Sequence, residues 1–431
     1  MTDAQLIRRR ERVLANHGYF FYDEPLHLVR GEGIWMWDSD GRRYLDCYNN
    51  VPSVGHCHPR VVEALTRQAR TLNTHTRYLH ENAIELCERL GARLPGELEA
   101  CMLVCTGTEA NDLAVQIARA VTGHHGVVVH EAGYYGNSTL VRQLSLADCP
   151  ESLREDWVAA AEPPDVYRGP FRAGEHDALG ARYAALLSDA VDALEARGHG
   201  TAALLVDPIW DSPGTLIAPD DYLSRCAERV RRAGGLLIAD EVQSGYCRMG
   251  THWWGFEHYG VQPDLVTLGK PMGDGHPLAA VVMSRGVAER YDKTPFASYF
   301  NTFGGNPVAA AVGCAVIDVI EDEGLLENAT QVGAHLERGL AELARRHPAI
   351  GCVQGRGLFW GLDLVVDPDT RAPMSSAALR RITTELACEG VLMGSTGRYG
   401  NVLKIRPPLV FSAENADQAL DAIDRVLGRQ A

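Results

Sequence analysis

The sequence predicts an α/β fold, in which helices cover a mostly parallel sheet, together with a second and smaller α+β domain. With 431 residues, the chain is long enough for one large domain and one smaller domain. Between about residues 56 and 325, short aliphatic runs alternate with helical patterns, as in parallel sheets. After that point, amphipathic helical patterns enclose short strand patterns instead.

Six aliphatic runs are the strand candidates of the large domain. They span residues 101–105, 126–130, 202–207, 235–240, 264–269 and 278–283. Polar residues, Gly or Pro bound each run, and buried strands of parallel sheets have this continuous apolar character. Helices are predicted between them, for example over 108–121 and 219–234, with Gly234 and Gly235 at the end of the second.

The two ends of the chain are predicted to form the small domain together. Helical spacing extends over residues 324–346 and 412–428, and strand patterns over 357–366 and 402–411. We expect residues 56–325 to form the large domain and residues 326–431 the C-terminal small domain. Residues 1–55 are expected to complete that small domain.

Composition and charge exclude several classes of partner. The formal net charge is −15, with 56 acidic against 41 basic residues and no basic cluster, so we expect no nucleic-acid partner. The eleven cysteines lack paired metal spacing and indicate reduced thiols. No signal peptide and no run of membrane-spanning length are evident, so we expect a cytoplasmic protein without a membrane partner.

Lys270 and Asp240 are the first candidate site residues. Lys270 follows one predicted strand and Asp240 ends another, and ligands bind at the carboxyl ends of parallel strands. A lysine amine there can form a Schiff base with pyridoxal phosphate, whose ring nitrogen needs an acidic partner. Taken singly, Lys270 could be a surface cation and Asp240 a helix cap.

Two further features lie at the same predicted edge. Thr106, Gly107 and Thr108 begin a helix whose free N–H groups could bind a phosphate, although an ordinary Thr-capped helix has the same pattern. Tyr134 and Tyr135 follow the 126–130 run, where an aromatic face could stack on a flat ring or serve only for packing.

Several segments together resemble the class III (ω) aminotransferase family of fold type I pyridoxal phosphate enzymes. They are residues 106–114, 236–250, 264–282, 299–313 and 403–412, and the similarity extends from about residue 20 to the C-terminus. The resemblance implies a mostly parallel seven-stranded sheet in the large domain and pyridoxal 5'-phosphate as the cofactor. Within the family, the chain is most similar to the branch of the ethanolamine-phosphate and 5-phosphohydroxylysine phospho-lyases.

The resemblance also implies roles for individual residues around the cofactor ring. Lys270 matches the Schiff-base lysine, which also moves the substrate proton. Asp240 matches the carboxylate at the ring nitrogen, and Val242 the residue that packs beneath the ring. Gln243 matches the residue that binds the phenolic oxygen, and Asp207 stands where the family usually has a glutamate.

The remaining cofactor contacts follow from the same resemblance. Gly107 and Thr108 match the phosphate cradle, and Tyr134 matches the tyrosine that stacks on the opposite ring face. Thr302 matches a threonine that reaches the phosphate from the neighbouring subunit, which implies a homodimer, or a tetramer, with active sites at the interface. The chain departs from the family pattern at Tyr135, which replaces a histidine, and at Asp274, which replaces the branch's asparagine. A carboxylate at position 274 would disfavour a dianionic substrate, or it could face a cationic one.

Fixed cations are required to bind a substrate phosphate or carboxylate. Arg406 aligns with a commonly basic position of the family, and Arg77 and Arg168 are further candidates. Tyr22 and Asn50 are candidate hydrogen-bond donors from the N-terminal segment. Surface or interface ion pairs are the alternative for Arg77 and Arg168.

The predicted function is elimination of phosphate and ammonia from a small phosphorylated or phosphonate-bearing amine to give an aldehyde. Transamination between an amine or amino acid and a keto acid is the alternative, because both reactions use the same lysine. A nicotinamide dehydrogenase is disfavoured because no GxGxxG run follows the first strand. An inactive binding protein is disfavoured by Lys270, Asp240 and Gln243, and the segment 55–59 lacks the spacing of a metal site.

Overall fold

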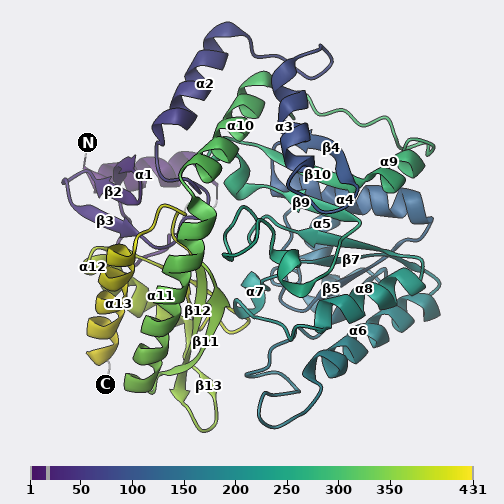
Figure 1. Cartoon of the computed structure of the whole chain (residues 1–431). Helices are drawn as coiled ribbons and strands as arrows, with labels where there is room; N and C mark the ends of the chain where they lie inside the picture. The colour runs from purple at the N-terminus through teal and green to yellow at the C-terminus, as the bar shows by residue number, and fades with distance from the viewer. Residues whose placement is uncertain (1, 16–19, 430–431) are drawn as a thin grey trace.

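A seven-stranded sheet forms the centre of the large domain (Figure 1). The computed structural model describes residues 2–15 and 20–429. The spatial order of the strands is β4-β10-β9-β8-β7-β5-β6. Their bounds are β4 Leu98–Val104, β5 Gly126–His130, β6 Val158–Ala161, β7 Thr201–Val206, β8 Leu236–Asp240, β9 Leu265–Leu268 and β10 Ala279–Ser284. β10 runs antiparallel to both neighbours, whereas β9, β8, β7, β5 and β6 are parallel, so the predicted mostly parallel sheet is confirmed.

Six of the seven strands coincide with the predicted aliphatic runs. The seventh, β6, lies outside them because three of its four residues are alanines, which have little preference for strands. Two continuous apolar cores cover the two faces of the sheet. Val127 and Val129 of β5 join one core and Val128 joins the other, as expected when successive side chains of a strand alternate.

Helices cover both faces of this sheet (Figure 1). They are α2 Pro59–Thr71, α3 Glu81–Gly91, α4 Gly107–Thr122, α5 Thr139–Leu144, α6 Leu179–Ala196, α7 Asp211–Gly214, α8 Tyr222–Arg232, α9 Arg285–Tyr291 and α10 Pro307–Asp322. The predicted helices over 108–121 and 219–234 correspond to α4 and α8. α4 contributes to one core, and α6 and α8 pack together in the other.

Two smaller sheets form the rest of the molecule. One has the order β1-β2-β3-β14, from Leu28–Glu32, Trp35–Asp38, Arg43–Asp46 and Val391–Leu392. The other has the order β11-β12-β16-β15, from Ile350–Arg356, Phe359–Asp367, Val402–Ile405 and Gly394–Thr396, with β13 Ala372–Pro373 paired to β12. The helices α1 Asp3–Val13, α11 Leu325–Arg346, α12 Ser376–Cys388 and α13 Ala413–Gly428 accompany them.

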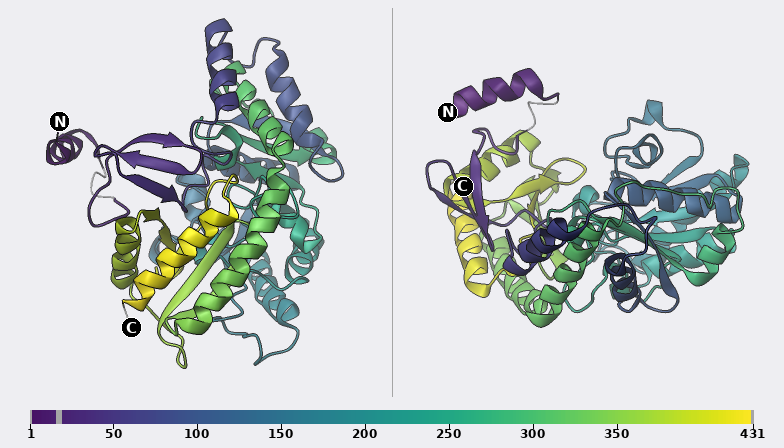
Figure 2. Two further views of the ribbon diagram at one scale, coloured as in Figure 1. Left: turned by 60° about the vertical axis from the view of Figure 1, so that its left-hand side comes forward. Right: turned by 90° about the horizontal axis from the view of Figure 1, so that it is seen from above.

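The N-terminal and C-terminal parts of the chain share one of these sheets. β3 pairs in parallel with β14, with Leu45 opposite Val391, and Figure 2 shows the purple N-terminal strands beside the C-terminal helices. This pairing agrees with the expectation that the N-terminal segment completes the small domain. The predicted domain limits at residues 55 and 325 remain predictions. The predicted strand over 402–411 ends at Ile405, since Pro407 and Pro408 have no N–H for a ladder.

Helix α4 has well-defined ends that determine where its first turn lies. Thr106 is its N-cap. The Thr106 hydroxyl accepts a hydrogen bond from the Glu109 N–H, and the Glu109 carboxylate accepts one from the Thr106 N–H. Gly123 ends the helix in the left-handed region, with φ 71°. The first turn of α4 is therefore held immediately after the carboxyl end of β4.

Three chemical features of the described chain bear on function. All eleven cysteines, which lie within the described residues, are free thiols. Across residues 2–15 and 20–429, no group of three or more His, Cys, Asp or Glu side chains could hold a metal ion. No helix in the same part of the chain is long and apolar enough to cross a lipid bilayer.

Candidate active site

The carboxyl ends of the parallel strands bring Lys270 and Asp240 together. Asp240 is the last residue of β8, and Lys270 begins the short 3-10 helix η3 Lys270–Gly273 after β9. Burial and the nearby Arg406 lower the pKa of Lys270, whereas the carboxylates of Asp240 and Asp211 oppose this shift. The amine of Lys270 is therefore easier to deprotonate than that of an exposed lysine.

Asp240 is buried and accepts hydrogen bonds at both carboxylate oxygens. Asn111 Nδ2 donates to Oδ2 over 2.8 Å, and the Val242 N–H donates to Oδ1 over 3.0 Å. Burial raises the pKa of Asp240, and these two hydrogen bonds oppose the shift. Since both donors are neutral, a protonated ring nitrogen would fit here as the positive partner of a buried carboxylate.

Close packing of two glycines places the first turn of α4 beside Lys270. A Cβ atom on Gly107 would lie 3.0 Å from Val242 Cγ2. A Cβ atom on Gly269, the residue before Lys270, would lie 3.2 Å from the same Val242 atom and 3.4 Å from the Gly107 backbone nitrogen. The free N–H groups of this turn and the Thr108 hydroxyl fit a phosphate close to the lysine.

A second cluster of buried polar residues lies next to Lys270. Lys404 Nζ is 3.1 Å and 3.2 Å from the two carboxylate oxygens of Asp211. Gln243 Nε2 donates to Asp211 Oδ2 over 2.6 Å, and Gln243 Oε1 accepts from Arg406 over 2.7 Å and from Asn50 over 2.9 Å. Asp211, Lys404, Arg406 and Asn50 are each less than a tenth exposed.

This second cluster carries more positive than negative charge. Burial opposes ionisation of Asp211, but Lys404 and Arg406 outweigh it and lower the Asp211 pKa. Burial and Arg406 lower the pKa of Lys404 to about 8, so the amine is still protonated at neutral pH. Burial and the neighbouring Asp211 and Asp240 raise the pKa of Asp207, which disfavours its charged form. Lys404 and Arg406 both lie beside Asp211.

The two tyrosines after β5 differ in environment. Tyr134 is 42% exposed, so part of the residue is open to solvent. Tyr135 is buried, and its carbonyl accepts a hydrogen bond from Asn111 over 2.9 Å. The ring-stacking role of Tyr134 remains a prediction.

Three of the predicted site residues have other contacts or are exposed in the subunit. Arg77 is exposed, with its guanidinium 3.8 Å from the centre of the Phe300 ring. Thr302 is also exposed, two residues from Phe300. Tyr22 is buried, but its hydroxyl donates to the Met393 carbonyl over 3.1 Å, which gives it a structural contact in the small domain.

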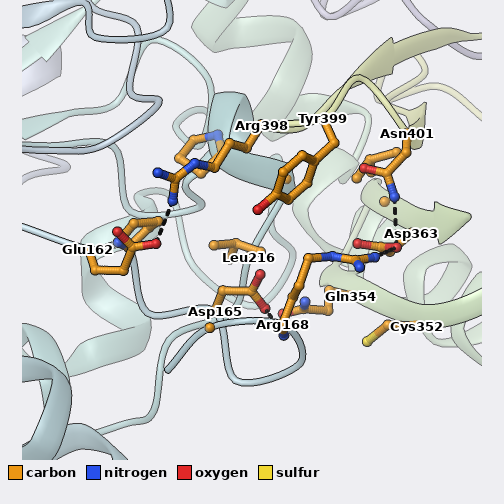
Figure 3. Close-up of a pocket in the computed structure, with 16 residues that line it drawn as sticks. Glu162, Asp165, Arg168, Leu216, Cys352, Gln354, Asp363, Arg398, Tyr399 and Asn401 are labelled. Carbon is orange, nitrogen blue, oxygen red and sulfur yellow. Dashed lines mark hydrogen bonds and ion pairs between the residues drawn. The ribbon is translucent and has the colours of Figure 1, made fainter. Parts of the chain in front are cut away.

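Arg168 belongs to a different cavity, of about 40 Å³, shown in Figure 3. Its guanidinium pairs with Asp363 of β12, and Arg398 on the β15–β16 turn pairs with Glu162 after β6. These ion pairs join the segment after β6 to the sheet of the C-terminal part. Arg168 therefore has partners that hold two parts of the fold together.

Asp274 also has a structural partner. Its Oδ1 accepts the Val54 N–H over 3.0 Å, and its backbone lies in the left-handed region with φ 46°. Burial raises its pKa to about 7. The carboxylate thus connects the turn after Lys270 to the N-terminal segment at Val54, and we assign it no substrate contact.

Sequence reasoning missed three residues of the site: Asn111, Asp211 and Lys404. Asn111 lies in the segment 106–114, whose first turn was the predicted phosphate site. Asp211 is four residues beyond Asp207. Lys404 is one of only three lysines in the chain, on a strand that is buried throughout, and a lysine in a buried strand was the available signal.

A partly buried lysine, a buried carboxylate and a glycine-lined helix terminus at one edge of a parallel sheet define an enzyme site for a phosphorylated carbonyl cofactor. The family description aminotransferase class-III matches residues 21–427, and the chain belongs to that family. It is therefore an enzyme of the predicted family.

Individual relatives cover almost the whole chain. An ethanolamine-phosphate phospho-lyase homolog of Caenorhabditis elegans is 37% identical over 98% of this chain and 93% of its own length. An alanine–glyoxylate aminotransferase 2-like protein of Drosophila melanogaster is 39% identical over 97% of this chain and 86% of its own length. The structure of a phospholyase from Arthrobacter in complex with phosphoethanolamine is 40% identical, covers 98% of this chain and 99% of that one, and superposes with a TM-score of 0.93. This similarity confirms the predicted fold type I architecture.

Proposed function

We propose that this chain is a pyridoxal phosphate-dependent lyase that removes phosphate and ammonia from a small phosphorylated amine such as O-phosphoethanolamine. Phosphate leaves with the electrons of its C–O bond, one water is consumed, the nitrogen leaves as ammonia, and the carbon unit remains as an aldehyde. The observation that carries the proposal is the buried pair of cations, Lys404 and Arg406, opposed by one ionised Asp211. The names of the Caenorhabditis and Arthrobacter relatives support the same reaction.

The cofactor fits the residues at the sheet edge. The Lys270 amine would bond its aldehyde carbon, Asp240 would face its ring nitrogen, and Gly107 and Thr108 would hold its phosphate. When bound, pyridoxal phosphate supplies an electron sink for the carbon that carries the substrate amine. Gln243 is oriented by Asp211, Asn50 and Arg406, which agrees with a fixed hydrogen bond to the cofactor's phenolic oxygen.

Lys270 is the proton carrier of the proposed reaction. Burial and Arg406 lower its pKa, which increases the fraction of neutral amine near neutral pH. The neutral amine takes the proton from the substrate carbon that bears the nitrogen. Departure of the phosphate from the next carbon then requires no second base.

Lys404 and Arg406 would bind the leaving phosphate. Their ammonium and guanidinium groups lie 5.8 Å and 4.5 Å from the centre of the Tyr48 ring, on one side of the cluster. Charge-assisted hydrogen bonds to oxyanions are the strong ones, and their strength rises in a buried site. With Asp211 between them, the two cations leave one uncompensated positive charge, which attracts an oxyanion such as the substrate phosphate.

Transamination is the second candidate. Lys270, Asp240 and the phosphate-binding turn serve both reactions equally, and the Drosophila relative is named as an aminotransferase. The cations could then bind the carboxylate of an amino acid or keto acid. Phosphate release without any keto acid separates the two reactions.

We further propose a homodimer whose active sites include residues of both subunits. Exposed apolar side chains surround Arg77 and Thr302, among them Leu79 at 98% and Phe303 at 69% exposure, and such patches mark interfaces. Thr302 and Arg77, which are both exposed in their own subunit, would act at the partner's site. The free thiols support a reducing compartment, and we place the enzyme in the cytoplasm.

The test is incubation of the purified enzyme, with pyridoxal phosphate bound, with O-phosphoethanolamine alone and with an amine plus pyruvate. Release of phosphate and ammonia in the first reaction, in equal amounts, supports the proposal. Formation of alanine only in the second reaction would overturn it in favour of transamination. Lys270→Ala should abolish both activities while leaving the thermal unfolding cooperative.

A further inference from the structure

Helix α4 carries two groups of the site on one face. Gly107 and Thr108 lie in its first turn. Asn111 is four residues after Gly107 and three after Thr108, so it lies on the same face of the helix as both. Gly107 packs against Val242 near Lys270, whereas Asn111 points to Asp240. The same rigid element therefore contacts both ends of the space in which the cofactor fits.

The orientation of the Asn111 amide follows from its neighbours. The Tyr135 carbonyl lies 2.9 Å from Asn111 Nδ2 and cannot donate, so the amide must present its NH₂ group there. The amide oxygen then accepts the Thr267 hydroxyl proton over 2.6 Å. The second N–H of the amide is the one that Asp240 Oδ2 accepts over 2.8 Å.

This arrangement leaves Asp240 only the role of acceptor. One oxygen takes the Asn111 N–H and the other the Val242 N–H, so neither contact needs a proton on the carboxyl group. Asn111, Thr267 and Asp240 are all less than a twentieth exposed, so water does not compete for these bonds. A buried network whose members are all satisfied rigidifies its groups.

We propose that Asn111, with its amide oriented by Thr267, is a positioning residue that keeps Asp240 ionised and aimed at the ring nitrogen of the cofactor. Asn111 acts through Asp240 and is not itself a catalytic residue. Because it lies on α4, the helix that would bind the phosphate also sets the partner of the ring nitrogen. This inference depends on pyridoxal phosphate being the cofactor, as proposed above, but not on which reaction follows.

The test compares two ligands in the substrate-free protein. One is pyridoxal phosphate, and the other is its carbocyclic analogue, in which a C–H group replaces the ring nitrogen. Dissociation constants are measured from the quenching of the intrinsic fluorescence of the seven tryptophans. Asn111→Leu has a side chain of similar volume without hydrogen-bonding groups.

Asn111→Leu should weaken the binding of pyridoxal phosphate about tenfold to a hundredfold, the size expected for loss of a hydrogen bond to a charged group. It should weaken the binding of the carbocyclic analogue less than about threefold, because that ligand does not use Asp240. Equal losses for both ligands would overturn the proposal and assign Asn111 a packing role.

A second pair of variants covers the case in which Asn111→Leu does not fold. Thr267→Val removes the hydroxyl that orients the amide, and Thr267→Ser retains it. Thr267→Val should weaken pyridoxal phosphate selectively by about threefold to tenfold, and Thr267→Ser should bind like wild type. Absence of a selective loss in Thr267→Val would also overturn the proposal.

The wild-type protein separates this inference from the proposed function. If it bound neither ligand, the proposed cofactor would be wrong. If it bound pyridoxal phosphate without releasing phosphate from O-phosphoethanolamine, only the proposed reaction would be wrong.

Discussion

Lys404 and Asp211 form a buried ion pair beside Lys270, with Nζ 3.1 Å and 3.2 Å from the two carboxylate oxygens. The pair joins β16 of the C-terminal part to α7 of the large domain. With Arg406 next to it, the pair leaves one positive charge uncompensated where the substrate's phosphate is proposed to bind.

Replacement of Lys404 by Met should raise the KM for O-phosphoethanolamine about tenfold or more, because a charge-assisted bond to the phosphate is lost. The kcat should change less, since Lys270 and Asp240 remain. Steady-state phosphate release measures both constants. Lys404→Arg is the matched control and should stay within about threefold of wild type; an unchanged KM in Lys404→Met would contradict the assignment.

The pH dependence of binding should follow the same lysine. Burial and Arg406 lower the Lys404 pKa to about 8, so its positive charge is lost as the pH rises through that value. We expect the KM for the phosphorylated amine to increase above about pH 8 in the wild-type enzyme. The increase should be absent in Lys404→Arg, because a guanidinium stays protonated. A KM that rises identically in both proteins would show that another group titrates.

Asp211→Asn should have opposite effects on stability and on anion binding. Removal of the carboxylate leaves Lys404 buried without its counter-charge, which costs about 3–5 kcal/mol in the free energy of unfolding. The unpaired cations should bind inorganic phosphate more tightly, so product inhibition should become stronger. Thermal unfolding with and without phosphate measures both effects, and phosphate should restore most of the lost Tm. A variant that is destabilised but not rescued by phosphate would argue against an anion site.

Asp274→Asn should stabilise the enzyme at alkaline pH. Burial raises the pKa of Asp274 to about 7 from an ordinary value of 3.8, so between these values the folded protein holds a proton that the unfolded chain has lost. Stability from this group is therefore fully present at low pH and falls as the pH rises to about 7. Asparagine keeps an acceptor for the Val54 N–H, tolerates the left-handed backbone and does not titrate.

The free energy of unfolding should be about 2–4 kcal/mol higher in Asp274→Asn than in wild type at pH 8, and the difference should be much smaller at pH 5. Unfolding in urea at the two pH values measures it. Asp274→Ala, which lacks the acceptor, should gain less than the asparagine variant at pH 8. An equal advantage of Asp274→Asn at both pH values would show that the carboxylate does not titrate in this range.

The proposed sharing of active sites between subunits can be tested by complementation. Lys270→Ala and Thr302→Arg should each be nearly inactive alone. In a mixed dimer, one site combines the intact Lys270 of one subunit with the intact Thr302 of the other. Random mixing by co-expression should therefore restore about a quarter of wild-type activity. No restoration in tagged and purified mixed dimers would place Thr302 in the site of its own subunit.

The sequence alone was sufficient to predict six of the seven strands and the ends at which Lys270 and Asp240 lie. Continuous aliphatic runs can be recognised without knowledge of the fold, because strands buried on both faces exclude polar residues. β6 was missed because alanines carry little local information. The turn that includes Gly107 was predicted because its signals lie within a few neighbouring residues.

The cation cluster depended on contacts between distant parts of the chain. Lys404 and Asp211 are 193 residues apart, and neither residue's neighbours in sequence show that they meet. The sequence offered three arginines as candidates to bind the substrate's acid group: Arg77, Arg168 and Arg406. Of these, Arg406 acts on Lys270, whereas Arg77 lies over Phe300 and Arg168 pairs with Asp363. Local patterns determined the strands and the edge at which the chemistry lies, since they depend on the apolar character of adjacent residues. Tertiary packing determined which charges share that edge, because the energy of a buried charge depends on every group around it.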